Sequence, residues 1–221
     1  MEAITIGHAG GVGDGLMFSS VIKEKYCKEY DRVYIQVPRL NWLFEKLYNE
    51  TPNLSTGTCP HEYHAPHIGL RFQDGVEHSS WRNLTWDYDV NKEDRLYNEL
   101  VQTHGKDYII VHERPVDNMK RPMIGINKKH FMNPNLPVIN LDGRAGHILD
   151  YRKVLQNAKE VHVYEGSFMN MADSVTNGVP LFGHLYCKPH YFDTKMVHHE
   201  IIKYIKENKW HKNNWNYIWE R

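Results

Sequence analysis

The sequence predicts an α/β protein made of two small Rossmann-like lobes with mostly parallel sheets. Short apolar segments alternate with segments whose apolar residues recur at helical spacing, a pattern typical of a parallel sheet covered by helices. The alternation is clearest at the two ends of the chain, over residues 1–50 and 138–192. Between them, four prolines interrupt residues 115–137, which we interpret as a linker or hinge.

The first lobe, residues 1–114, is expected to begin as β-α-β-α. Its elements are a strand over 3–7, a helix that follows a glycine-rich run and reaches residue 30, a strand over 32–37 and a helix over 41–50. Residues 51–91 lose this periodicity and are predicted as long loops with two short strands. A helix over 92–104 and a buried strand over 107–112 complete the lobe.

The second lobe, residues 138–192, repeats the alternation more cleanly. Its elements are strands over 138–141, 161–164 and 179–182, with helices over 148–158 and 168–176. Residues 193–221 then add an amphipathic helix over 194–209 and a tail over 210–219. The tail is so rich in aromatic side chains that we expect it to pack back on the body of the protein.

Composition limits the classes of protein that this chain can represent. Hydrophobic residues make up 41% and charged residues 24% of its 221 residues, without an apolar run near the ~18 that a membrane span needs. We expect no membrane span, and because the chain lacks a charged-then-apolar leader and has only 3 cysteines, we expect a cytoplasmic protein. Lys+Arg and Asp+Glu balance at 27 each, which argues against a dedicated nucleic-acid binder.

The run His8-Ala9-Gly10-Gly11-Val12-Gly13-Asp14-Gly15 joins the first strand to the first helix. A strand that turns through glycines into a helix gathers backbone N–H groups at the positive helix end, which suits an anionic ligand. The spacing fits neither the dinucleotide fingerprint nor the P-loop. Asp14 would repel a phosphate, so we expect it to take a proton from a hydroxyl group. The alternatives are a plain strand-to-helix turn and an N-cap role for Asp14.

Further motifs lie in the second half of the chain. They are Asn140-Leu141-Asp142-Gly143-Arg144, Glu165-Gly166-Ser167-Phe168-Met169-Asn170 and Pro180-Leu181-Phe182-Gly183. With Gly11-Val12-Gly13-Asp14, they resemble the motifs of the heptosyltransferase-type glycosyltransferases, family 9 of the GT-B fold, over residues 1–50 and 138–185. Glu165 stands where the family has aspartate, Gly166 and Ser167 invert the family's Ser/Thr-Gly order, and Asn170 replaces a histidine.

The resemblance implies a compact GT-B-like fold whose two lobes face a cleft. It also implies transfer of a sugar from a nucleotide-sugar donor to a glycan or other hydroxyl acceptor, with inversion and with Asp14 as the general base. Because of the three departures, the nucleotide, the sugar and the acceptor stay open. The small size would suit a phage or viral enzyme in the host cytoplasm.

The chemistry of particular residues indicates where the nucleotide-sugar donor would bind. A helix that starts at Gly166-Ser167-Phe168 offers free N–H groups to diphosphate oxygens without a metal, although Ser167 could instead be only an N-cap. Glu165 could bind a ribose or pair with an arginine. The residues expected at the donor are Gly11, Gly13, His112, Arg114, Arg121, Glu165, Gly166, Ser167, Phe168 and Asn170. For the two arginines, a solvated surface position is the alternative.

The acceptor-side candidates are His8, His64 and Trp81, and packing in the core is the alternative that a tryptophan more often takes. His61, His64 and His67 recur every three residues, which makes metal binding a lesser alternative; we expect no metal and no cofactor besides the nucleotide sugar. Two other functions stay open. One is glycosylation of a hydroxymethylated DNA base, held by Lys120-Arg121, Lys128-Lys129-His130 and the aromatic tail. The other is a non-catalytic nucleotide- or carbohydrate-binding module.

Overall fold

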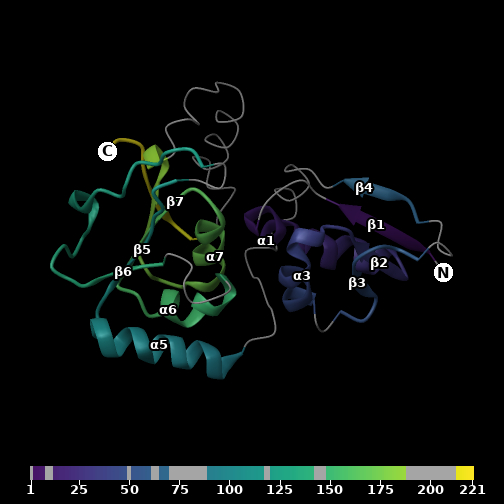
Figure 1. Ribbon diagram of the computed structural model, residues 1–221, viewed down its shortest axis with the longest axis horizontal. Coiled ribbons are helices and arrows are strands. Elements are labelled where there is room, and N and C mark those ends of the chain that lie inside the picture. Colours follow the sequence, from purple (N-terminus) through teal and green to yellow (C-terminus); the bar gives the residue numbers. More distant parts are fainter. Residues whose placement is uncertain are drawn as a thin grey trace. The chain divides into compact units, whose positions relative to one another are not determined.

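The chain divides into two compact units, Met1–Asp87 and Tyr88–Arg221, each with its own parallel sheet (Figure 1). The computed structural model describes residues 2–7, 12–48, 51–60, 65–69, 89–116, 120–141, 148–187 and 213–221. The predicted α/β class with two lobes of parallel strands is confirmed. The first unit ends at residue 87 of the chain rather than at residue 114, because strand 109–112 pairs with strands of the second unit.

The sheet of the first unit has the strand order β3-β2-β1-β4, with parallel pairing throughout. Its strands are β1 (Ala3–Gly7), β2 (Arg32–Ile35), β3 (Leu54–Thr56) and β4 (His67–Gly69). The central strand β1 is buried along its whole length. The two short strands expected within 51–91 are β3 and β4, which form the two edges of this sheet.

The described residues of the first unit also form helices α1 (Val12–Val21), α2 (Cys27–Glu29) and α3 (Asn41–Tyr48), with a 3₁₀ turn, η2 (Pro38–Leu40), before α3. Gly15 allows α1 to approach α3 closely, because a Cβ there would lie 2.8 Å from the side chain of Leu43. The helix expected to reach residue 30 is interrupted by a π-turn, η1 (Ile22–Tyr26). A π-turn widens the helix locally, so the single helical period expected from sequence does not continue through it.

The sheet of the second unit has the order β6-β5-β7-β8-β9 and is also parallel throughout. Its strands are β5 (Ile109–His112), β6 (Val138–Asn140), β7 (Glu160–Tyr164), β8 (Leu181–His184) and β9 (Trp215–Ile218). The described residues of this unit also form helices α5 (Val90–His104), α6 (Arg152–Gln156) and α7 (Ser167–Val175), with 3₁₀ turns η4 (Lys128–His130), η5 (Ile148–Tyr151) and η6 (Leu185–Cys187). The helix expected over 148–158 is therefore a 3₁₀ turn followed by a short α-helix.

The two faces of this sheet are covered differently. On one face lie α6 and α7: the Tyr108 hydroxyl donates to the carbonyl of Val154, and a Cβ on Gly183 would lie 2.6 Å from Met169. On the other face lies an irregular segment over residues 123–133, which we call the strap. Phe131 of the strap packs against Ile109 and Val111 of β5.

Residues 115–137 are therefore not a linker between the units. The strap packs against the core of the second unit, and side-chain acceptors of the same unit bind its amides. Prolines predicted a break in regular structure at this point, and that much is confirmed. A break in regular structure does not by itself separate two domains, because irregular backbone can also pack tightly when its amides find acceptors.

The aromatic tail packs back on the body of the protein, as expected, and it does so as strand β9. β9 pairs in parallel with β8, and Trp215 is buried. The carboxylate of Asp173, on α7 and itself fully buried, accepts hydrogen bonds from the Trp215 indole (2.9 Å) and the Asn213 amide (3.0 Å). The helix expected over 194–209 lies outside the described residues.

Replacing Asp173 by asparagine is expected to lower the free energy of unfolding by about 1.5–3 kcal/mol, the usual contribution of hydrogen bonds to a charged group. Urea denaturation followed by tryptophan fluorescence measures this change. Asp107→Asn is the matched control, because the Asp107 carboxylate is largely exposed and pairs only at the surface with Lys159. An equal loss in both variants would show that the buried carboxylate of Asp173 does not hold the tail.

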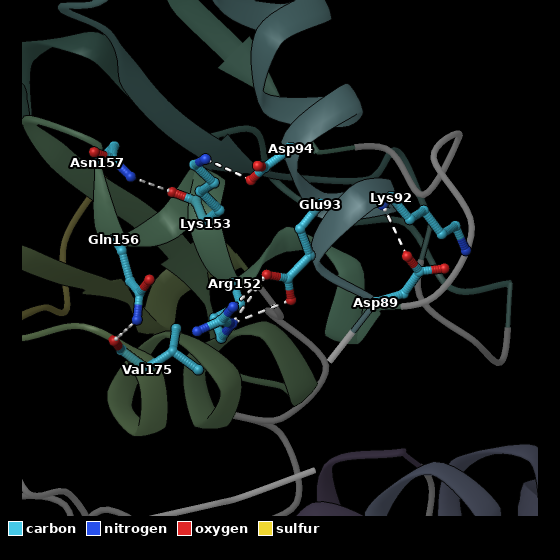
Figure 2. Close-up of polar contacts among 9 residues, drawn as sticks. All are labelled: Asp89, Lys92, Glu93, Asp94, Arg152, Lys153, Gln156, Asn157 and Val175. Atoms are coloured by element: carbon cyan, nitrogen blue, oxygen red, sulfur yellow. Dashed lines mark hydrogen bonds and ion pairs between the residues drawn. The ribbon is translucent and has the colours of Figure 1, made fainter. Parts of the chain in front are cut away.

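Helix α5 is fixed to the segment before β7 by three ion pairs in sequence order. They join Lys92 to Asp150, Glu93 to Arg152 and Asp94 to Lys153, and Figure 2 shows the second and third. Glu93 is buried, and Arg152 donates to its carboxylate from both Nε (3.0 Å) and Nη2 (2.6 Å). This two-pronged geometry fixes α5 in register along α6.

Among the described residues, no helix is both long enough and apolar enough to cross a membrane.

Candidate functional site

The strand order of the second unit reverses between β5 and β7. From β5 the chain moves outward to β6, and then returns to place β7 on the other side of β5. In open parallel sheets, ligands bind beyond the carboxyl ends of the two strands that flank such a reversal. β5 ends at His112 and β7 ends at Tyr164, and residues 111–112 of β5 pair with 162–163 of β7. The segments that follow the two strands therefore leave the sheet next to each other.

Most residues of the predicted donor site lie in these two segments. His112 and Arg114 are at the end of β5, and Glu165, Gly166, Ser167, Phe168 and Asn170 follow β7. Arg121 lies on the same connection as Arg114, beside a bridge between Val116 and Pro122. Arg114, Arg121, Glu165 and Ser167 are partly exposed, as ligand-binding side chains must be.

His112 and Phe168 are buried, and their rings link the two segments. The His112 ring lies 4.0 Å from the Phe168 ring and 4.9 Å from the Tyr164 ring, measured between centroids. Phe168 also contacts Tyr151 edge-on. These contacts connect β5, β7 and α7, so His112 and Phe168 support the base of the candidate site. Asn170 is likewise buried on α7 and does not face solvent.

The first turn of α7 supplies backbone donors at this edge. Gly166 is the N-cap, without a side-chain capping bond, and Ser167 is the first residue of the helix. The alternative role of Ser167 as an N-cap is therefore wrong. A Cβ on Gly166 would lie 3.2 Å from the Tyr164 ring, so the close approach of that ring favours glycine. The first N–H groups of a helix have no partner within it, and they attract anions.

The glycine-rich run of the first unit also follows a strand at a reversal, because β1 lies between β2 and β4. Residues 8–11, which include His8 and Gly11, are outside the described residues. Gly13 and Asp14 are described by their backbone alone, in the first turn of α1. Since α1 has already begun by Val12, Asp14 is inside the helix, and the N-cap alternative for Asp14 is wrong.

The remaining candidates are those proposed for the acceptor side and for metal binding. His64 and Trp81 lie outside the described residues, as does His61. His67 is an exposed residue of β4. Within the described ranges, no three or more His, Cys, Asp or Glu residues are grouped so that they could hold a metal ion.

Four polar side chains form a buried hydrogen-bonded network, the buried polar chain, on the face of the second sheet that the strap covers. Their burial was not predicted from the sequence. Glu160 and His162 of β7, His184 of β8 and Tyr186 of η6 are all buried. Hydrogen bonds join Glu160 Oε2 to His162 Nε2 (3.0 Å), His162 Nδ1 to His184 Nε2 (2.9 Å) and His184 Nδ1 to the Tyr186 hydroxyl (3.2 Å). Part of the signal was available as Glu-x-His in β7, since residues two apart in a strand share a face, whereas His-x-Tyr runs from β8 into η6.

Burial has the largest effect on the pKa values of the side chains in this buried polar chain. It lowers the pKa of His162 in spite of the opposing hydrogen bond to Glu160, and it lowers the pKa of His184 to about 3. Burial alone would raise the pKa of Glu160, but hydrogen bonds from His162, Met132 and Asn133 together lower it. Glu160 is therefore ionised and both histidines are neutral at physiological pH.

Neither a protein-family model nor a curated protein matches the sequence. Among solved structures, the chain is similar to a glycosyl transferase of family 9 from Veillonella parvula DSM 2008, with 11% sequence identity and a TM-score of 0.49. The similarity covers 82% of this chain and 80% of that chain.

Proposed function

We propose that this protein transfers a sugar from a nucleotide-sugar donor to a hydroxyl acceptor, and that the donor binds at the carboxyl ends of β5 and β7. One observation carries the proposal. The segment 165–170, which resembles a motif of the heptosyltransferase-type glycosyltransferases, follows β7, and β7 together with β5 flanks the reversal in the second sheet. The glycine-rich run with Asp14 likewise follows the strand at the reversal in the first sheet.

The proposed reaction uses backbone and side-chain charge at this edge. The first amides of α7 and the Ser167 hydroxyl hold the diphosphate, and Arg114 and Arg121 contribute positive charge. The acceptor oxygen bonds to the anomeric carbon from the face opposite the diphosphate, while the bond from that carbon to the diphosphate oxygen breaks. Asp14 takes the proton of the acceptor hydroxyl. Since α7 and the arginines stabilise the departing diphosphate, the proposed reaction needs no metal ion.

Titrating the protein with UDP-, GDP-, ADP- and dTDP-sugars should raise its melting temperature with one nucleotide class. A ligand at 100 times its dissociation constant stabilises the folded state by about 2.7 kcal/mol. Ser167→Ala should reduce this ligand-dependent shift while leaving the unliganded melting temperature unchanged, because Ser167 is the first residue of α7 and not its N-cap. If none of the four classes shifts the melting temperature, the donor site is wrong.

The same preparation tests the two rival functions. Retention of the protein on hydroxymethylated duplex DNA, lost steeply as salt increases, would favour a DNA acceptor. Donor binding without release of free nucleotide in the presence of any acceptor would favour a non-catalytic binding module.

A further inference from the structure

The strap is attached to the second unit by acceptors that lie mostly on side chains. Ile126 N–H donates to Glu113 Oε2 (2.7 Å), and Asn127 N–H donates to the Tyr186 hydroxyl (2.8 Å). At the other end of the strap, the amides of Met132 (2.8 Å) and Asn133 (2.9 Å) donate to the two oxygens of Glu160. Tyr186 and Glu160 are the two ends of the buried polar chain described above.

The hydrogen bonds determine which ring nitrogen of His162 and of His184 carries the proton in the buried polar chain. Ionised Glu160 only accepts, so His162 carries its proton on Nε2 and accepts at Nδ1. His184 must then donate from Nε2 and accept at Nδ1, where the Tyr186 hydroxyl donates. These tautomers follow from the network, because each ring nitrogen has one partner. With both imidazoles neutral, every ring nitrogen and the Tyr186 hydroxyl have a hydrogen-bond partner.

The strap is also the cover of the two rings. Both His162 and His184 have 0% exposure. The Phe131 ring of the strap lies 4.5 Å from the His162 ring, and the His130 ring lies 5.6 Å from the His184 ring, between centroids. On the neighbouring strand β8, the ring of Phe182 stacks on that of His162, with 4.3 Å between centroids. Water therefore reaches the two imidazole rings from the face that the strap covers only if the strap moves away.

We propose that the strap is a proton-sensitive cover, which stays closed over the neutral His162–His184 pair and lifts when the pair binds a proton. A proton added to His162 places Nδ1–H against the Nε2–H of His184. A proton added to His184 at Nδ1 makes the Tyr186 hydroxyl rotate to accept it, which takes from the Tyr186 O–H its own acceptor. In both cases the network loses a hydrogen bond, and a buried positive charge must be hydrated.

The charged and titratable groups around His162 and His184 determine how readily the two imidazoles bind a proton, and hence at which pH the strap opens. Among the described residues these are Glu160 from β7, His130 from η4, Glu113 after β5, Tyr186 and Cys187 from η6, and Arg221. Glu160 attracts a proton to His162, whereas His130 and burial oppose protonation of the pair. The closed strap is therefore fully favoured above the ordinary histidine pKa of 6.5, and it loses stability as the pH falls from 6.5 toward about 3.

Amide hydrogen exchange of the full-length protein between pH 8 and pH 4.5 tests this proposal, with each rate corrected for its intrinsic pH dependence. The amides of Ile126, Asn127, Met132 and Asn133 should lose protection together, about tenfold per pH unit below the histidine pKa for each proton bound. Core amides of β7, such as that of Val163, should keep their protection over the same range. Strap amides that stay protected to pH 4.5, or two strap ends that open at different pH, would overturn the proposal.

A variant separates the proton from other effects of acid. In His184→Gln the amide group can donate to His162 and accept from Tyr186 as the neutral ring does, but it does not titrate. This variant should need a lower pH to open the strap than the wild type does. His104→Gln, at the end of α5, is the control and should behave as the wild type. If His184→Gln opens at the wild-type pH, or the variant does not fold and the wild-type amides show no tenfold dependence, the proposal fails.

Discussion

Replacing Asp14 by asparagine is expected to reduce turnover by about 10²–10⁴-fold while leaving the affinity for the donor unchanged. The reason is that asparagine keeps the size and polarity of the side chain but does not accept the proton of the acceptor hydroxyl. The donor, in this proposal, is bound by residues of the second unit. Release of free nucleotide measures turnover, and calorimetric titration of the donor measures affinity.

Asp31→Asn is the control for this result, because Asp31 is an exposed carboxylate of the same unit that accepts a hydrogen bond from the Glu2 amide. It should leave both quantities unchanged. Unaltered turnover in Asp14→Asn would remove Asp14 from the reaction even if the donor binds as proposed. A wild-type protein that binds a donor but releases no nucleotide would contradict the transferase function itself.

Replacing Arg152 by methionine is expected to lower the free energy of unfolding of the second unit by about 3–5 kcal/mol. The substitution leaves the Glu93 carboxylate buried, with its two-pronged partner removed (Figure 2). A buried charge without compensation is among the most destabilising defects that a single substitution can introduce. Urea denaturation measures the change.

The double variant Glu93→Leu with Arg152→Met should recover most of this loss, because replacing both charges by apolar groups removes the unpaired ion as well. Arg95→Met provides the surface control on the same helix. Arg95 and Glu99 are both exposed and 3.9 Å apart, so its effect should stay below about 0.5 kcal/mol. A double variant as unstable as Arg152→Met alone would show that packing, rather than the unpaired charge, causes the loss.

Local pattern was enough to locate most strands of both sheets. β1, β2, β5 and β7 were expected within a few residues of their observed bounds, because a short apolar segment between turn residues is a property of adjacent positions in the chain. The start of α7 was also expected, since glycine before an apolar helical segment indicates a strand-to-helix turn. The grouping of Glu165–Ser167 beyond the end of β7 followed from the same local signals.

Local pattern failed where distant residues decide the outcome. The prolines of 115–137 suggested a hinge, but the strap is bound to the sheet by Glu113, Tyr186 and Glu160, which come from three separate parts of the chain. β9 was expected only as a packed aromatic tail, because strand pairing with β8 depends on a neighbour that is remote in sequence.

The sequence by itself determined the α/β class, the alternation of strands and helices, and the turns that carry the candidate site, because each depends on residues close together in the chain. Only the tertiary structure decided the order of the strands, the assignment of β5 to the second unit, and the burial of Glu160, His162 and His184. A polar residue in a strand usually indicates a solvent-exposed face. Whether that face is covered instead depends on hydrogen-bond partners supplied by distant segments, which no local period encodes.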